Sequence, residues 1–69
     1  MSENERDLFK IILDTDGDVY QNDLTRKSGL EKYQVSRILQ RFEGYGLIHK
    51  EKFGMTNQIH LKTFDFDLD

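Results

Sequence analysis

The chain has 69 residues, with ten basic and thirteen acidic side chains, no cysteine and no proline, and its formal net charge is −3. A chain of this length has room for one small core, so we expect a single domain over residues 1–69, with its core in 5–63 and an acidic tail at 64–69. The lack of cysteine excludes disulfides. Since there is neither a leader nor a long apolar run, we expect a cytoplasmic protein without membrane contact.

The charge is distributed unevenly along the chain. Residues 1–23 carry seven acids and two bases, residues 24–62 carry eight bases and three acids, and residues 63–69 carry three acids. A phosphate backbone responds to the nearest face of a protein rather than to its total charge. The basic middle block therefore favours a nucleic-acid partner, and chance unevenness in a small domain is the alternative interpretation.

The first predicted element is a helix over residues 4–14. Ser2 or Asn4 can cap it, and Glu5 suits the positive end of its dipole. Its apolar stripe comprises Leu8, Phe9, Ile11, Ile12, Leu13 and Thr15. A turn follows over residues 14–18, and Val19 and Tyr20 predict a short edge strand.

Two further helices are predicted in close succession, over residues 21–28 and 32–45. Leu24 faces inward on the first, and Gly29 after it suits a left-handed C-terminal position. Leu30 is expected in the core. Gly44 and Gly46 end the second helix, whose buried face comprises Val35, Ile38, Leu39 and Phe42. Two helices joined by a short turn that contains glycine form a helix-turn-helix unit.

The last predicted element is a hairpin wing over residues 47–63. Two β-like runs, 47–53 and 58–64, are joined by the segment Gly54–Asn57. Its apolar face comprises Leu47, Ile48, Phe53, Ile59 and Leu61, and its polar side chains include His49, Lys50, Lys52 and Lys62. The predicted fold class is therefore α+β, a small winged helix-turn-helix with three helices, a short edge strand and a C-terminal hairpin.

The free face of the helix over 32–45 carries side chains that suit base edges and phosphates in the major groove. A basic hairpin beside it can contact the DNA backbone. The candidate DNA-binding residues are Lys32, Tyr33, Gln34, Ser36, Arg37, Gln40 and Arg41 on this helix, and Lys50, Lys52, Thr56 and Asn57 on the wing. An ordinary solvated helix face is the alternative interpretation.

Four stretches carry a family resemblance: Tyr20–Leu24, Ser28–Leu30, Val35–Leu39 and Gly46–Ile48. Together they resemble the winged helix-turn-helix domains of MarR-, Lrp- and TrmB-type regulators of archaea and bacteria, over roughly residues 5–62. The resemblance implies binding of double-stranded DNA, usually as a homodimer and usually in transcription regulation, with the helix over 32–45 as the reader. Two positions depart from the pattern: Met55 stands where the wing tip often has arginine, and Glu31 stands where a serine or aspartate often begins the reading helix.

Other chemistries are weakly supported. Asp14, Asp16 and Asp18 resemble part of a calcium loop, but Thr25 stands where the bidentate glutamate would be needed. His49 and His60 can approach each other across the hairpin, yet two histidines without cysteine make a poor zinc site.

No nucleophile with a base and no phosphate-binding loop can be assembled, so we expect a protein that is not an enzyme and has no metal, cofactor or small-molecule substrate. The alternative function is a protein-interaction module in a larger assembly. The tail 64–69 alternates apolar and acidic residues, which predicts an ordered chain through Phe64.

Overall fold

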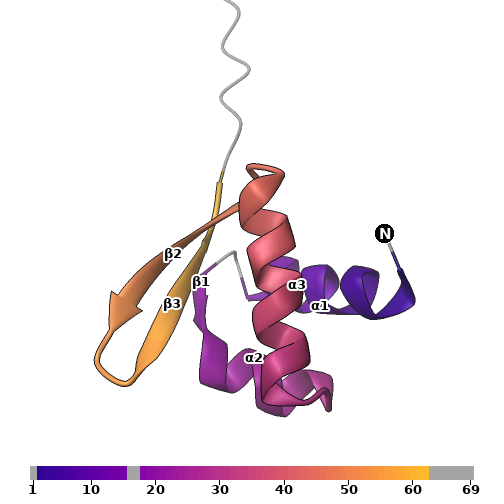
Figure 1. The fold of residues 1–69 in the computed structure, drawn as a ribbon, viewed down its shortest axis with the longest axis horizontal. Coiled ribbons are helices and arrows are strands. Elements are labelled where there is room, and N and C mark those ends of the chain that lie inside the picture. The colour runs from indigo at the N-terminus through magenta and orange to yellow at the C-terminus, as the bar shows by residue number, and fades with distance from the viewer. Residues whose placement is uncertain (1, 16–17, 63–69) are drawn as a thin grey trace, which may run out of the picture.

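The computed structural model describes residues 2–15 and 18–62. Its elements, in chain order, are α1 (Glu3–Asp14), β1 (Asp18–Tyr20), α2 (Gln21–Ser28), α3 (Lys32–Gly44), β2 (Ile48–Phe53) and β3 (Thr56–Leu61). Helix α3 crosses in front of α1, α2 lies below both, and the sheet stands to one side (Figure 1). The predicted α+β class, with three helices, a short edge strand and a C-terminal hairpin, is confirmed, and the topology is winged-helix-like. Among the described residues, no helix has the length and apolar character that a membrane span requires.

The ends of α1 and α3 follow from local hydrogen bonding. The predicted cap of α1 is Ser2, whose Oγ accepts the Glu5 N–H at 3.3 Å while Glu5 Oε1 accepts the Ser2 N–H at 2.7 Å. Gly46 has φ of 78°, and its N–H and that of Leu47 bond back to the Glu43 and Phe42 carbonyls. This arrangement is a Schellman motif, in which a left-handed glycine ends the helix and satisfies its last carbonyls.

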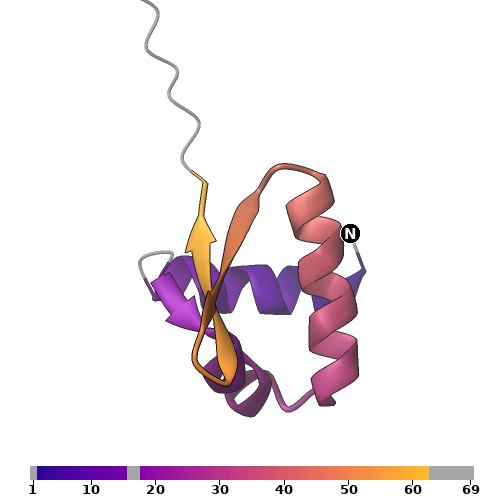
Figure 2. The same cartoon turned by 60° about the vertical axis from the view of Figure 1, so that its left-hand side comes forward.

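The three strands form one antiparallel sheet in the order β1-β3-β2. Val19 in β1 lies opposite Ile59, and Lys50 in β2 lies on the other side of Ile59. The short β1 is thus an edge strand, as predicted, and β3 is the central strand. Figure 2 shows the hairpin extending beside α2 and away from the C-terminal end of α3.

The core lies where the helices meet the sheet. Within residues 2–15 and 18–62, nine apolar side chains are buried in it: Leu8, Ile12, Val19, Leu24, Val35, Leu39, Phe42, Ile48 and Ile59. The Phe42 ring lies edge-on to Phe9, with 5.3 Å between centroids. Leu30 and Ile38 pack against this core but stay half-buried. The polar face of α3 is exposed to solvent because the apolar side chains of this helix pack against the core.

Two predicted core positions are wrong. Leu13 is exposed, because Leu8 and Ile12 take the inward direction of α1 and the next residue along a helix turns about 100° away. Phe53 is also exposed. It lies five residues after buried Ile48 in the same strand, and an odd separation places two side chains on opposite faces of a sheet.

The predicted hairpin loop is two residues too long. Thr56 pairs with Phe53 and Asn57 with Lys52, so only Gly54 and Met55 form the connection. Gly54 has φ of 58°. Two-residue hairpin loops with a glycine in this conformation match the twist of the strands, which extends the pairing by two residues. Strand β3 ends at Leu61, and the predicted continuation to Phe64 and the tail 64–69 lie outside the described residues.

Candidate functional site

The outward face of α3 presents most of the predicted contact residues to solvent. Its exposed side chains are Lys32, Tyr33, Ser36, Arg37, Gln40 and Arg41. Within residues 2–15 and 18–62, neither Lys32 nor Arg37 has a carboxylate within ion-pair distance. These two cations are therefore available to an anionic partner.

Gln34, which is predicted to contact a base, also stabilises the start of α3. It is half-buried in the first turn of α3, and its Oε1 accepts the backbone N–H of Glu31 at 3.0 Å. Glu31 occupies the N-cap position, where it departs from the family pattern. The reciprocal bond from Gln34 secures the start of the helix and reduces the freedom of this side chain to contact a base.

Arg41 is paired inside the domain. Its Nη1 lies 3.1 Å from Glu5 Oε2, and the guanidinium side chain stays 63% exposed while Glu5 is only 5% exposed. The hydrogen bond from the Ser2 N–H, followed by the one from Arg41, lowers the pKa of Glu5 below its ordinary value, and burial opposes this change. Because the positive charge of Arg41 compensates a buried carboxylate, Arg41 is a weaker candidate for phosphate contact than Arg37.

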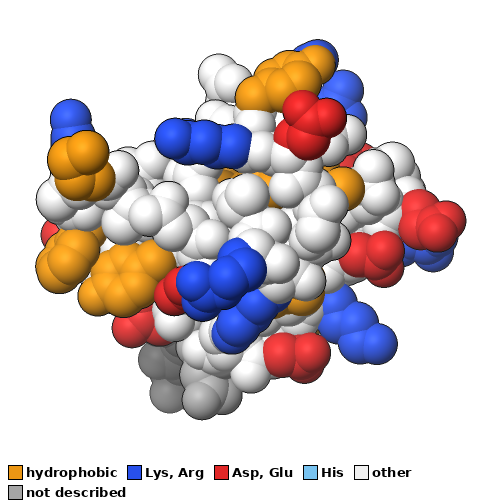
Figure 3. Space-filling view, turned by 90° about the horizontal axis from the view of Figure 1, so that it is seen from below, with side chains coloured by type: hydrophobic (Ala, Val, Ile, Leu, Met, Phe, Trp, Pro, Cys, Tyr) orange, Lys and Arg blue, Asp and Glu red, His pale blue; other side chains and the backbone are white. Residues whose placement is uncertain are grey.

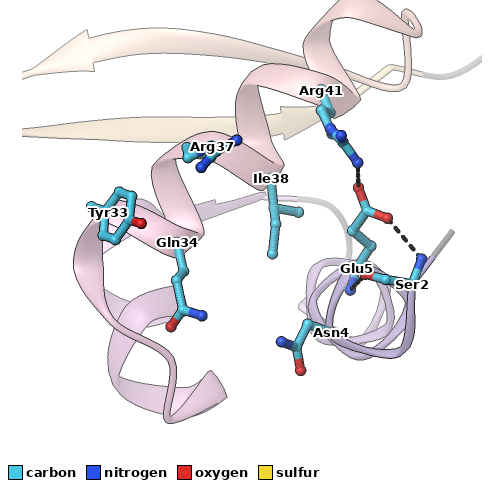
Figure 4. Close-up of a pocket in the computed structure, with 8 residues that line it drawn as sticks. All are labelled: Ser2, Asn4, Glu5, Tyr33, Gln34, Arg37, Ile38 and Arg41. Carbon is cyan, nitrogen blue, oxygen red and sulfur yellow. Dashed lines mark hydrogen bonds and ion pairs between the residues drawn. The ribbon is translucent and has the colours of Figure 1, made fainter.

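A groove of about 270 Å³ lies between α3 and the N-terminus of α1. Figure 4 shows Ile38 pointing into this space, Tyr33 at one end of it, and Arg41 reaching across to Glu5 at the other. Its lining residues are Ser2, Asn4, Glu5, Tyr33, Gln34, Arg37, Ile38 and Arg41. The start of α1, far away in sequence, thus borders the predicted reading face of α3.

The two predicted wing lysines differ in their surroundings. Lys50 is 24% exposed, and its Nζ lies 3.7 Å from Glu43 Oε1 at the end of α3. Lys52 is exposed and has no carboxylate partner in the part of the chain that the structure describes. Of the two, Lys52 is therefore the one available for a phosphate, whereas Lys50 fastens β2 to α3.

Thr56 and Asn57 join the wing to α2. Thr56 Oγ1 accepts the Asn22 N–H at 3.3 Å, and Asn57 Nδ2 donates to Gln21 Oε1 at 2.9 Å. The N-cap residue of α2, Tyr20, makes no side-chain capping bond, so the wing threonine caps this helix from a distant part of the chain. Both residues lie in β3 rather than in the predicted loop, and their bonds brace the hairpin against α2. Their predicted contact with DNA stays a prediction.

Helix α2 carries a further exposed cation. Figure 3 shows the underside of the fold, with Lys and Arg side chains near the middle and hydrophobic side chains at the hairpin end. Lys27, in the last turn of α2, is exposed and unpaired among the described residues, and the sequence analysis did not select it. The sequence alone gives little reason to select Lys27 for DNA binding, because a cation in the last turn of a helix is already favoured by the helix dipole.

The outer face of the sheet holds the predicted histidine pair. His49 and His60 are cross-strand partners with ring centroids 6.2 Å apart. His60 Nε2 lies 3.1 Å from Glu51 Oε1, and its Nδ1 lies 3.5 Å from Asp18 Oδ1. These contacts connect β3 to both β1 and β2, so the His60 ring lies between two carboxylates rather than on an open surface.

Residues 1–62 match the model of a family described as a domain of unknown function, DUF7343. Two archaeal relatives, both uncharacterized proteins, are 38% identical (Pyrococcus horikoshii) and 33% identical (Pyrococcus abyssi), each over 80% of this chain. The chain spans only 17% and 16% of the lengths of these two relatives. No solved structure matches. By the extent of the family match, the chain belongs to the DUF7343 domain family.

Proposed function

We propose that this domain binds double-stranded DNA and serves transcription regulation, with α3 in the major groove and the β2–β3 wing on the backbone. Such a regulator acts by binding rather than by catalysis, and it needs no cofactor. The resemblance to MarR-, Lrp- and TrmB-type domains is part of the same proposal. A homodimer on two half-sites is its expected assembly.

The observation that carries the proposal is the set of cations left without internal partners. Lys32 and Arg37 on α3 and Lys52 on the wing are exposed and unpaired within the described residues. Arg41 and Lys50 are compensated by Glu5 and Glu43. Unpaired surface cations on adjacent elements favour a phosphate backbone as partner, since each can replace a condensed counterion.

The surrounding fold supports this use of α3. Val35, Leu39 and Phe42 fix the helix on the core, so its opposite face projects as a rigid polar ridge. An α-helix fits the width of the major groove, where arginine can bind guanine through two hydrogen bonds. Arg37, one turn after Tyr33 and unpaired, is the residue best suited to that contact.

The test is fluorescence anisotropy with labelled duplex DNA over a series of salt concentrations. Two phosphate contacts, from Lys32 and Lys52, predict a slope of log K against log salt of about −2, because Arg37 is assigned to a base. Arg37→Ala should weaken binding to a preferred site by about 1–3 kcal/mol, and Lys52→Ala should weaken all duplexes alike. Lys10→Ala, a cation of similar exposure on α1, is the matched control and should bind like wild type. Equal affinity of all three variants would contradict the proposed interface.

A protein-interaction module is the second candidate, and the groove between α1 and α3 favours it. This groove combines the Ile38 side chain with two arginines and a tyrosine, the mixture that protein interfaces favour at their centres. The domain is also a small part of the length of its relatives. If Arg37→Ala leaves DNA binding intact and instead abolishes association with a purified protein partner, this second function replaces the first.

A further inference from the structure

Three apolar side chains are exposed at the outer end of the wing. Tyr20 is 36% exposed, Phe53 53% and Met55 101%. The rings of Tyr20 and Phe53 pack together with centroids 5.2 Å apart, and Met55 follows Phe53 by two residues in the hairpin loop. We call these three residues the wing-end patch. It corresponds to the hydrophobic group at the hairpin end in Figure 3.

The wing-end patch is held in a fixed position. The loop that carries Met55 has only two residues, and Gly54 supplies the left-handed backbone that the tight turn requires. Directly after the loop, Thr56 and Asn57 are hydrogen-bonded to the first turn of α2. The loop is therefore pinned to the helix-turn-helix unit, and no large ordering cost opposes its use in binding.

The size of the patch argues against a protein partner. Its exposed fractions correspond to roughly 400 Å² of surface, given the typical areas of such side chains. A standard protein–protein interface buries about 800 Å² on each partner. A wedge into DNA needs far less, since one or two apolar side chains inserted at a base step are sufficient to kink a duplex.

One cation near the tip of the hairpin, Lys52, is exposed and has no carboxylate partner among the described residues. It is next to Phe53 in β2 and faces the opposite side of the sheet. Glu51 shares the face of Phe53, and its Oε1 lies 3.1 Å from His60 Nε2. The nearest acid in the adjoining hollow, Asp23, is compensated by Arg26 at 2.7 Å. A cation beside an apolar tip matches the minor groove, which has phosphates along its rims and apolar sugar and base edges inside.

We propose that Met55, supported by Phe53 and Tyr20, enters the minor groove of bound duplex DNA and wedges against a base step. This inference rests on the proposed function and specifies how the wing binds. It also gives Met55, the position that departs from the arginine of the family pattern, a role of its own. A wedge at this position bends the duplex and favours flexible pyrimidine–purine steps over stiff A-tracts.

The test uses a short duplex with a central TA step, in which 2-aminopurine replaces the adenine, and a matched A-tract duplex. Wild-type protein should raise the 2-aminopurine fluorescence and bend the TA duplex by about 20° or more. Met55→Ala should abolish both signals and weaken binding to this duplex about tenfold. Met55→Leu should retain both. Lys52→Ala should weaken binding to both duplexes while leaving the fluorescence change at saturation intact.

Three other results would contradict the proposed wedge, and each has a different meaning. If wild type binds with an unchanged fluorescence and no bend, the wedge is wrong and the DNA-binding function stands. If wild type binds neither duplex, the proposed function fails together with the wedge. If Met55→Ala binds DNA normally but sediments as a smaller species than wild type, the patch is a protein contact. Met55 is fully exposed, so equal melting temperatures of the variants serve as the folding control.

Discussion

Replacing Thr56 with valine tests the bond between the wing and α2. Valine keeps the shape and the β-propensity of threonine but removes the Oγ1 that accepts the Asn22 N–H at 3.3 Å. Loss of a helix cap costs about 0.5–2 kcal/mol. Asn22 is exposed, so water can replace the lost acceptor, and the length of the bond also places its contribution low in that range. We expect a loss of about 1 kcal/mol in the free energy of unfolding.

Urea and thermal denaturation followed by circular dichroism measure this loss. For a domain of this size, about 1 kcal/mol lowers Tm by about 4–8 °C. Exchange of the Asn22 amide hydrogen should become about fivefold faster. Thr25→Val is the matched control, because Thr25 Oγ1 only donates back to the Gln21 carbonyl within α2, a bond that adds little to helix stability. The reasoning is refuted if Thr56→Val melts with wild type, or if Thr25→Val loses as much.

Three other substitutions test the fold. Glu5 has a lowered pKa in the folded state, so its stabilisation is present above the unfolded pKa of about 4.3 and is lost as the pH falls through the folded value. Urea midpoints of wild type and Glu5→Gln should therefore differ at about pH 7 and converge at about pH 2; a constant gap would exclude this ionisation as the cause. Phe42→Ala should cost about 3–5 kcal/mol, close to the whole stability of a small domain, and native circular dichroism at 25 °C would contradict it. Gly29→Ala should cost about 1 kcal/mol, because Gly29 has φ of 72° in open space, and an unchanged urea midpoint would refute the strain.

Local patterns predicted most of the fold. The i, i+3, i+4, i+7 spacing of Val35, Ile38, Leu39 and Phe42 identified α3 and its inward face, and three of these four side chains are fully buried. Gly29 marked the end of α2, where its left-handed backbone is confirmed. These features were predictable because each depends on residues within a few positions of one another.

Contacts between distant residues could not be predicted in the same way. The sequence predicts that Arg41 contacts DNA because it lies on the polar face of α3, but its partner Glu5 is 36 positions away. Asn57 and Gln21 are separated by the same distance along the chain. Polar composition alone does not distinguish a free side chain from one that is bonded within the fold. The structure is needed to separate the two groups in the predicted site. Of the cations in the predicted site, Lys32, Arg37 and Lys52 have no carboxylate partner within the described residues.

The most direct test of the proposed DNA-binding face is NMR chemical-shift mapping on the ¹⁵N-labelled domain during titration with duplex DNA. The proposal predicts the largest amide shifts in the first half of α3, around Lys32 and Arg37, and in the wing from Lys52 to Met55. Amides in the middle of α1, such as that of Lys10, should move little and serve as the internal reference. Shifts confined to α1, or no shifts with any duplex at low salt, would contradict DNA binding through this face.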